Sequence, residues 1–484
     1  MRHYYTAEQI RDAEAPLLAG LPDGVLMRRA AYGLAGVIAD ELRTRTGAVA
    51  GRTVCAVVGS GNNGGDALWA ATFLRRRGAA ASAILLKPEH AHPAALAAFR
   101  SAGGRVLGKV PAATDLVIDG VVGISASGPL RTPAAEMFAA VDAAGIPVVA
   151  VDIPSGVDVH TGAISGPAVH AAVTVTFGGR KPVHALADCG RVELIDIGLD
   201  LPDPGLLGME AADVAALWPR PGPSDDKYTQ GVVGVAAGSA AYPGAAILCT
   251  GAAVAATSGM KRYAGSAAAE VVSHWPEVVA AHRVEDVGRV QAWVIGPGIG
   301  TDEAALSALR WVLGTDLPVI VDADALTVLA SHPQLVRQRE AATVLTPHAG
   351  EYERFGFGPV GTDRVAAARR LAGALGATVL LKGNVTVIAD PAGRSEATGG
   401  SNPGSVYLNP AGGSWAATAG SGDVLSGIIG ALLASGVAAG EAAAAAAFVH
   451  ARAANASAAD PGPASVPTSA SAILAHIRPA LAQL

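Results

Sequence analysis

Short, continuous apolar runs alternate with helix-like patterns along almost the whole chain. In the first part these runs occupy residues 53–59, 82–86, 115–120, 147–153, 172–177 and 192–197. Segments with helical periodicity, such as DALWAATFLRRRG and PAAEMFAAVDAAG, lie between them. A strand without polar alternation is buried on both faces, which is typical of a parallel sheet covered by helices on both sides. The sequence therefore predicts an α/β protein.

The same alternation restarts after a proline-rich stretch, LPDPGLLGMEAADVAALWPRPGPSDD, at residues 201–226. New apolar runs follow at 231–238, 292–298, 318–326, 342–351 and 378–390. A chain of 484 residues is too long for one hydrophobic core. We therefore interpret 201–226 as a linker between two α/β domains, at 1–215 and 222–484. No internal repeat relates them, so we expect two different folds.

Composition and charge exclude several classes of function. The formal net charge is −6 and no run of lysine or arginine occurs, so neither nucleic acid nor an anionic membrane is an expected partner. Three scattered cysteines fit a reducing cytoplasm. The first residues are amphipathic and charged, unlike a signal peptide, and no apolar stretch reaches the roughly 20 residues of a membrane span. We expect a cytoplasmic protein.

The stretch VVGSGNNGGDALWAA follows a predicted strand and opens a predicted helix. It satisfies G-x-G-x-x-G, but that pattern alone is weak, and no acidic residue clearly follows at the next strand end to hold a ribose. Asn62, Asn63 and Asp66 add oxygen and amide groups to the loop. We interpret it as an anion- or cation-binding loop. The alternative is a tight turn with a helix cap at Asp66.

Two further predicted strands end in an acidic residue. Asp119 is followed by a loop of small residues at 123–129, and Asp152 is followed by Ser155. Ligands of open α/β sheets bind at the carboxyl ends of the strands, where these oxygens could together hold a hard cation. Taken singly, either aspartate could simply cap a loop.

The ordered motifs GNNGGDA, DGVVGISASG and DIPSGVD resemble the N-terminal half of the bifunctional NAD(P)H-hydrate repair enzymes. The resemblance implies a Rossmann-like three-layer α/β/α domain that epimerises NAD(P)HX, with Asp152 as a catalytic residue. It also implies a potassium site at Asn63, Asp119 and Ser155. The implied substrate-binding residues are Asn62, Asn63, Gly64, Gly65, Asp66, Gly123, Ile124, Ser125, Ala126, Ser127, Gly128, Pro129 and Asp152.

A second glycine loop, TAGSGDVLSG at 418–427, opens a long apolar segment. N–H groups at a helix N-terminus bind phosphate, yet this loop also contains Asp423. We interpret Asp423 as the base that accepts the proton of an attacking hydroxyl group, kept ionised by the positive helix end. The alternative is an ordinary N-cap aspartate.

Motifs of the second half, including TPHAGE, LKGNVTVI and GGSWAATAGSGD, resemble the ADP/ATP-dependent NAD(P)H-hydrate dehydratases. The resemblance implies a ribokinase-like fold that uses ADP with Mg²⁺. Ala246, Gly300, His348 and Asp423 would contact the hydrate, although His348 could equally be a satisfied loop residue. The implied nucleotide-binding residues are Lys382, Gly383, Asn384, Val385, Thr386, Gly413, Ser414, Ala419, Gly420, Ser421 and Gly422.

Together the two halves imply a metabolite repair enzyme, which we expect to be a homo-oligomer. Phosphorylation would convert the hydroxyl group on C6 of hydrated NAD(P)H into a leaving group, and the epimerase would supply the epimer that the dehydratase accepts. Two alternatives stay open: a small-molecule hydroxyl kinase fused to a non-catalytic nucleotide-binding module, and an N-terminal half that only binds a ligand or a protein. A P-loop ATPase is excluded because G-x-x-x-x-G-K-[ST] does not occur.

Overall fold

The computed structural model describes residues 1–124, 128–394, 401–402 and 404–484. The chain forms two compact units. The N-terminal unit is His3–Gly205, and the C-terminal unit combines Met1–Arg2 with Leu206–Leu484. The chain therefore passes between the units twice, and the main division falls ten residues before the predicted domain end at 215.

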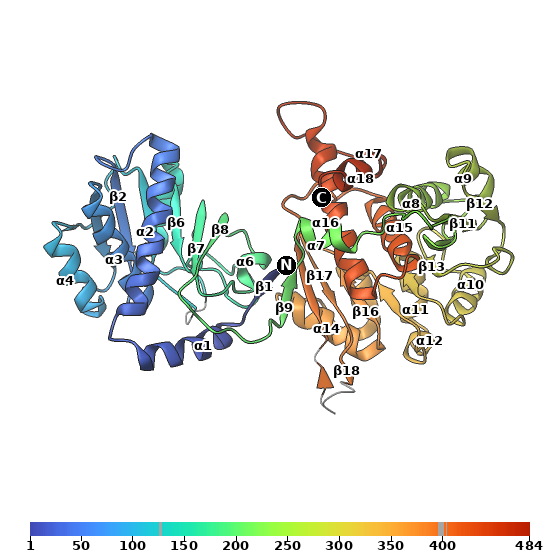
Figure 1. Ribbon diagram of the computed structural model, residues 1–484, viewed down its shortest axis with the longest axis horizontal. Helices are drawn as coiled ribbons and strands as arrows, with labels where there is room; N and C mark the ends of the chain where they lie inside the picture. Colours follow the sequence, from blue (N-terminus) through green and yellow to red (C-terminus); the bar gives the residue numbers. More distant parts are fainter. Residues whose placement is uncertain (125–127, 395–400, 403) are drawn as a thin grey trace. The chain divides into compact units, whose positions relative to one another are not determined.

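A sheet of seven parallel strands forms the centre of the N-terminal unit (Figure 1). All six predicted strands of this half are present. In spatial order the strands are β4 (Arg105–Val106), β3 (Ala80–Leu85), β2 (Thr53–Val58), β5 (Leu116–Gly120), β6 (Val148–Val151), β7 (Val173–Phe177) and β8 (Arg191–Ile195).

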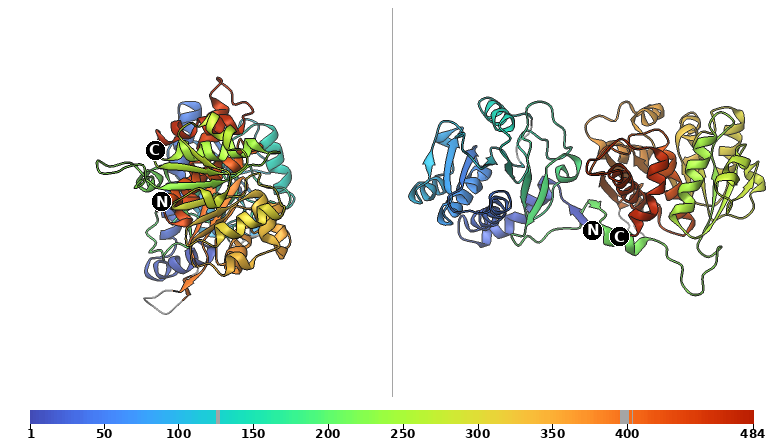
Figure 2. Two further views of the ribbon diagram at one scale, coloured as in Figure 1. Left: turned by 90° about the vertical axis from the view of Figure 1, so that its right-hand side faces the viewer. Right: turned by 90° about the horizontal axis from the view of Figure 1, so that it is seen from above.

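Helices cover both faces of this sheet (Figures 1 and 2). They are α1 (Ala7–Gly20), α2 (Val25–Thr46), α3 (Asn62–Arg76), the short η1 (Pro88–His90), α4 (Pro93–Ser101), α5 (Ala134–Ala143) and α6 (Val183–Leu186). Along β2, Val54, Ala56 and Val58 pack into the core shared with α2 and α3, while Cys55 and Val57 pack into the core shared with α5. This alternation explains why the strand is apolar throughout.

The C-terminal unit contains an eleven-stranded sheet. The strands β10 to β16 pair with one another in parallel, and β17 runs antiparallel to both of its neighbours, β16 and β20. In spatial order the strands are β1 (Arg2–Tyr4), β9 (Leu206–Gly208), β20 (Val406–Pro410), β17 (Val385–Ala389), β16 (Thr378–Leu381), β15 (Thr343–Leu345), β14 (Val319–Val321), β13 (Ala292–Ile295), β10 (Val232–Ala236), β11 (Met260–Ala264) and β12 (Val279–Ala281). A two-stranded sheet joins β18 (Gly393–Arg394) to β19 (Ser401–Asn402).

The apolar run at 378–390, predicted as one strand, is a hairpin. The strands β16 and β17 pair antiparallel, and Lys382, Gly383 and Asn384 form the turn between them. Glycine and asparagine are turn residues, and they interrupt the apolar run at this point. The hairpin matters for function because it places the KGN sequence at the end of a buried strand.

The helices of the C-terminal unit flank this sheet on both faces (Figure 2). They are α7 (Ala211–Leu217), α8 (Pro243–Ala256), α9 (Ala268–His274), η2 (Val284–Asp286), α10 (Glu303–Leu313), α11 (Ala323–Ala330), α12 (Gln334–Arg337), α13 (Ala349–Tyr352), η3 (Glu353–Phe357), α14 (Arg364–Leu375), α15 (Ser421–Ala434), α16 (Ala439–Ala459), α17 (Ala470–Ala475) and α18 (Ile477–Leu481).

The alanine-rich segment at 440–460 forms the helix α16, because alanine has the highest intrinsic helix propensity. Together with α8 and α15 it shares one hydrophobic core with a face of the sheet. The helices α8 and α15 approach closely, since a Cβ atom at Gly427 would lie 2.1 Å from the carbonyl oxygen of Cys249. Small residues thus hold α15 in one position, which fixes the loop at its N-terminus. None of the helices in the described residues is long and apolar enough to cross a membrane.

The predicted linker at 201–226 is wrong in its middle part. It contains β9 and α7, which both belong to the C-terminal unit. Val214 and Trp218 are buried in the core of that unit, and the Trp218 indole donates a 2.9 Å hydrogen bond to the Ala256 carbonyl. Because prolines surround this segment, we interpreted it as a linker and did not predict the short amphipathic helix. The apolar face of this helix packs on the C-terminal unit.

Candidate active sites

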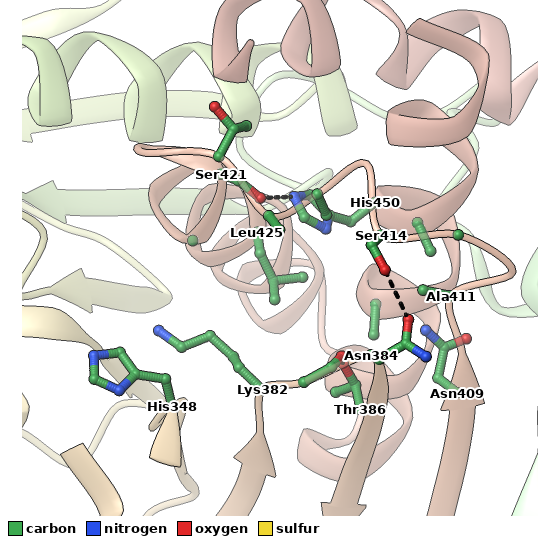
Figure 3. A pocket seen from close by; sticks show the side chains of 18 of the residues that line it. His348, Lys382, Asn384, Thr386, Asn409, Ala411, Ser414, Ser421, Leu425 and His450 are labelled. Carbon is green, nitrogen blue, oxygen red and sulfur yellow. Dashed lines mark hydrogen bonds between the residues drawn. The ribbon is translucent and has the colours of Figure 1, made fainter. Parts of the chain in front are cut away.

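Asp423 lies in the first turn of α15, directly after Gly420, which adopts a left-handed backbone with φ 82°. The residues at the start of this helix, Ser421 and Gly422, line a cavity of about 600 Å³ (Figure 3). Nine of the eleven predicted nucleotide-binding residues line the cavity; Val385 and Gly420 lie outside the lining. The nine are Lys382, Gly383, Asn384, Thr386, Gly413, Ser414, Ala419, Ser421 and Gly422. Its volume is within the usual range for a small-molecule site.

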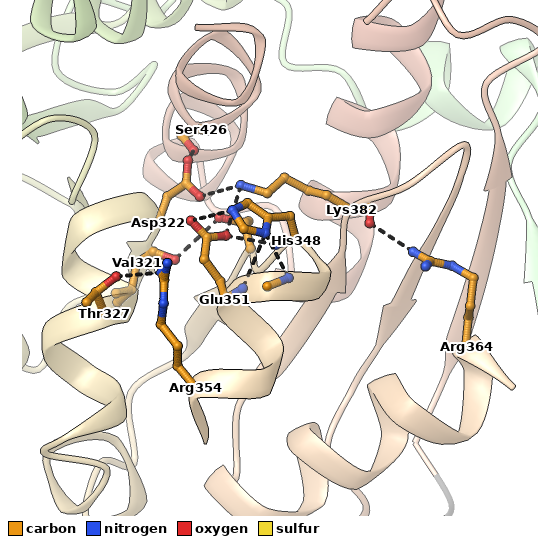
Figure 4. A network of polar contacts seen from close by, with 11 residues as sticks. Val321, Asp322, Thr327, His348, Glu351, Arg354, Arg364, Lys382 and Ser426 are labelled. Carbon is orange, nitrogen blue, oxygen red and sulfur yellow. Dashed lines mark hydrogen bonds and ion pairs between the residues drawn. The ribbon is translucent and has the colours of Figure 1, made fainter. Parts of the chain in front are cut away.

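A network of charged groups surrounds the inner end of this cavity (Figure 4). The carboxylate of Asp322 is almost fully buried and accepts hydrogen bonds from the Lys382 ammonium group at 2.8 Å and the Ser426 hydroxyl at 2.7 Å. Glu351 lies 3.6 Å from the same ammonium group. Burial alone would lower the pKa of Lys382, but Asp322 and Glu351 raise it, so the side chain stays charged.

The positive end of the helix does not hold the pKa of Asp423 at its ordinary value, contrary to our prediction. Burial and the negative charge of Asp322 together raise its pKa to about 7, while Lys382 acts in the opposite direction. A base whose pKa lies near the working pH can both accept and release a proton. The environment therefore suits Asp423 to proton transfer.

The three other predicted hydrate contacts differ in position. His348 lines the cavity, and its Nδ1 atom also caps α13 by accepting hydrogen bonds from the Gly350 and Glu351 amides. The amide of Gly300 donates to Asp324, whose charge also acts on Asp423. Ala246 is fully buried in α8 and packs where a Cβ atom of Gly238 would be. His348 therefore has hydrogen-bond partners within its own loop and also lines the cavity.

The predicted potassium ligands of the N-terminal unit converge. Asp119 is fully buried, and its carboxylate accepts hydrogen bonds from the Ser155 hydroxyl at 2.7 Å and the Ser155 amide at 2.8 Å. The amide group of Asn63 donates to the carbonyls of Val122 and Val151, which fixes its side chain between β5 and β6. Its oxygen would lie 2.4 Å from a Cβ atom at Gly123, so only glycine fits there.

Asp152 is held by an unusual set of contacts at the end of β6. Its backbone is left-handed, with φ 69°, which is rare for a residue with a side chain. Its Oδ1 atom accepts hydrogen bonds from the Lys181 ammonium group at 2.6 Å and the Thr176 hydroxyl at 2.9 Å. His184, whose pKa burial lowers to about 4, faces the Asp152 carbonyl at 2.8 Å. The buried ammonium group of Lys181 compensates the charge of this carboxylate.

The other predicted residues of this unit surround the same strand ends. The helix α3 begins with Asn62, and its first five residues also include Gly64, Gly65 and the buried Asp66. Gly123 and Ile124 follow β5, and Gly128 adopts φ 88° before Pro129. Ser125, Ala126 and Ser127 lie outside the described residues. In the described part of the chain no group of three or more His, Cys, Asp or Glu side chains could hold a metal ion.

Known proteins match both units. The family described as NAD(P)H-hydrate dehydratase matches residues 233–476, and the family described as YjeF-related protein N-terminus matches residues 23–183. The bifunctional NAD(P)H-hydrate repair enzyme Nnr of Mycobacterium leprae is 70% identical over 484 residues, which is 100% of both chains. The chain belongs to the family of bifunctional NAD(P)H-hydrate repair enzymes.

More distant members of this family match along the same length. The enzyme of the same name from Corynebacterium glutamicum is 37% identical and covers 90% of this chain and 87% of its own. Among solved structures, an ADP/ATP-dependent NAD(P)H-hydrate dehydratase from Bacillus subtilis, co-crystallised with ATP and Mg²⁺, is 27% identical over 57% of this chain and 98% of its own, with a TM-score of 0.48.

Several charged residues near both sites of this repair enzyme were not predicted. Asp322 directly follows the strand β14, and Glu351 caps a helix after β15. The acidic residue after the apolar run PVIV could have been predicted as a site residue. It lies at the carboxyl end of a strand, which is the argument already used for Asp119. Lys181 offered no such signal. It follows β7 by four residues and meets Asp152 only through the tertiary fold.

Proposed function

We propose that the C-terminal unit dehydrates hydrated NAD(P)H with ADP or ATP and that the N-terminal unit epimerises the same hydrate. The observation that carries the first activity is the position of Asp423, with its pKa of about 7, at a helix N-terminus beside a buried ammonium group. The observation that supports the second is the pair Asp152 and Lys181, which follow the strands β6 and β7.

In the dehydratase reaction, Asp423 accepts the proton of the C6 hydroxyl group while its oxygen attacks the terminal phosphorus of the nucleotide. Lys382 and the N–H groups at the start of α15 stabilise the negative charge that develops on the phosphoryl oxygens. The lone pair of the ring nitrogen then expels inorganic phosphate, and loss of the C5 proton restores the dihydropyridine. Net consumption is one phosphoanhydride bond for each hydrate, with ADP as the expected donor.

Mg²⁺ would enter this site together with the nucleotide. Mg²⁺ is usually held by substrate phosphates and one or two carboxylates, and the described residues around Asp423 include the carboxylates of Asp322 and Asp324. A bound Mg²⁺ ion would neutralise charge on the phosphates. The protein contributes the base, the ammonium group and the helix N-terminus.

The residues Asn63, Asp119 and Ser155 fit a potassium ion. Burial raises the pKa of Asp119 to about 6, although hydrogen bonds from Ser155 and Val121 lower it. A monovalent cation would offset the charge of this buried carboxylate, and the side chains of Asn63 and Ser155 both contact the backbone of Val122. All three residues offer the hard oxygen ligands that such an ion prefers. The ion would organise the loops after β5 and β6 around Asp152, the expected catalytic residue of the epimerase.

Product analysis tests this proposal against a hydroxyl kinase. The full chain is incubated with NADHX and ADP, and NADH absorbance and inorganic phosphate are measured together. Equal amounts of NADH and phosphate are expected, whereas a kinase would leave a stable organic phosphate and no NADH. Parallel reactions with ATP and with NADPHX would establish the preferred donor and substrate. We also expect a cytoplasmic homo-oligomer, which light scattering of the purified chain would test.

A further inference from the structure

A second cavity, of about 500 Å³, lies within the N-terminal unit. One wall comes from the start of α3 and includes Asn62 and Asp66, which were predicted to contact the substrate. The opposite wall comes from α1 and α2 and includes Glu14 and Met27, which neither the motifs nor the resemblance singled out. The two walls are in direct contact, because a Cβ atom at Gly65 would lie 2.9 Å from the Met27 sulfur.

Asp66 is the feature of this cavity that calls for a ligand. Its side chain lines the cavity, the residue is only 6% exposed, and its Oδ1 atom has no hydrogen-bond partner among the described residues. A buried polar atom without a partner is costly, and such atoms are rare in folded proteins. A ligand oxygen in the cavity could supply the missing hydrogen bond.

The rest of the lining indicates what kind of ligand fits. Apolar side chains dominate it, including Leu26, Met27, Trp69, Phe177 and Ile197. Burial raises the pKa of Glu14, which the charge of Lys181 opposes, and burial together with nearby carboxylates raises the pKa of Asp66 well above its usual range. Both groups are therefore poorly solvated and suited to form hydrogen bonds with an uncharged ligand. A neutral ring with polar oxygens suits this lining, whereas a diphosphate group does not.

We propose that this cavity holds the hydrated nicotinamide ring of the substrate, with Glu14 and Asp66 forming hydrogen bonds with its hydroxyl and carboxamide groups. The proposal rests on the proposed epimerase function and adds α1 and α2 to the substrate site. Arg28 also lines the cavity, and its guanidinium group lies 5.8 Å from the centre of the Trp69 ring. Arg28 is a suitable partner for the diphosphate group of the substrate, which does not suit the lining of the cavity itself.

The test uses full-length variants and purified epimers of NADHX. Glu14→Met keeps the size of the side chain but removes the hydrogen bond, and it should raise the KM for the epimer that requires epimerisation by about 10-fold. Glu14→Gln still donates a hydrogen bond and should remain within a few-fold of the wild type. Glu8→Met, at an exposed position of the same helix, is the matched control.

A second variant, Met27→Trp, fills the cavity with a larger side chain and should abolish epimerisation. This test leaves Glu14 unchanged and is therefore independent of it. In each sample, thermal unfolding and circular dichroism report that the N-terminal unit is folded, and dehydration of the directly accepted epimer, which takes place in the C-terminal unit, should stay unchanged. Normal epimerisation by Glu14→Met or by Met27→Trp would overturn the inference, as would a Glu14→Gln chain that is as impaired as Glu14→Met. A wild-type chain that cannot use the second epimer would instead overturn the proposed epimerase function.

Discussion

Replacing Asp423 with asparagine tests the assignment of the base in the C-terminal unit. The amide has nearly the same shape as the carboxyl group but cannot accept the proton of the attacking hydroxyl. We expect kcat for dehydration to fall by about 10²- to 10⁴-fold, the usual contribution of a general base. The affinity for nucleotide should change little, because the N–H groups of α15 and Lys382 remain.

The same substitution should stabilise the protein, with a defined dependence on pH. The pKa of Asp423 is about 7 in the folded chain, above the ordinary value of 3.8. A carboxyl group whose pKa is raised in the folded chain does not lower the free energy of unfolding at a pH below its unfolded pKa. As the pH rises toward the folded pKa, the group lowers the free energy of unfolding more and more. The difference corresponds to at most about 4 kcal/mol. Asp423→Asn should therefore raise Tm above neutral pH and leave it unchanged near pH ~4.

The assay combines NADH recovery from the directly accepted epimer with thermal unfolding at several pH values. In the wild type, kcat should rise with pH through about 7, as Asp423 loses its proton. Asp460→Asn, an exposed position at the end of α16, is the control and should alter neither property. Near-normal turnover by Asp423→Asn would refute its role as the base. Loss of turnover without the pH-dependent gain in Tm would refute the argument from burial.

Three further predictions concern the N-terminal unit and the division of the chain. Asp119→Ala should abolish epimerisation and leave dehydration of the directly accepted epimer intact; loss of both in a folded chain would contradict two separate sites. Lys181→Met leaves the buried Asp152 carboxylate unpaired and should lower the free energy of unfolding by about 3–5 kcal/mol. Urea denaturation measures this change, and an unchanged midpoint would count against that ion pair. A piece comprising 206–484 should be soluble, whereas 222–484 should melt lower because it lacks β9 and α7; equal melting temperatures would show that α7 is dispensable.

The sequence alone determined the class of the fold and most of the residues that line the dehydratase cavity. Apolar runs that are buried on both faces indicate parallel strands, as β2 illustrates. Glycines directly before a helix indicate that the N–H groups of its first turn are accessible, as at Gly420. These features are local, because they depend on backbone conformation and on the period of the side chains. The same is true of the strand-end aspartates, which share one edge of the sheet once the strands are parallel.

Only the tertiary structure decided which charges meet and how they alter one another. Lys181 lies 29 residues from Asp152 in the sequence, and Lys382 lies 60 residues from Asp322, yet each pair is in contact. The pKa of Asp423 depends on its burial and on Asp322, and neither can be read from the helix that contains it. The same holds for α7, whose apolar face became a core element only because the C-terminal unit offered a complementary surface. Burial and long-range charge pairing are properties of the packed chain, so they lie beyond what local sequence patterns encode.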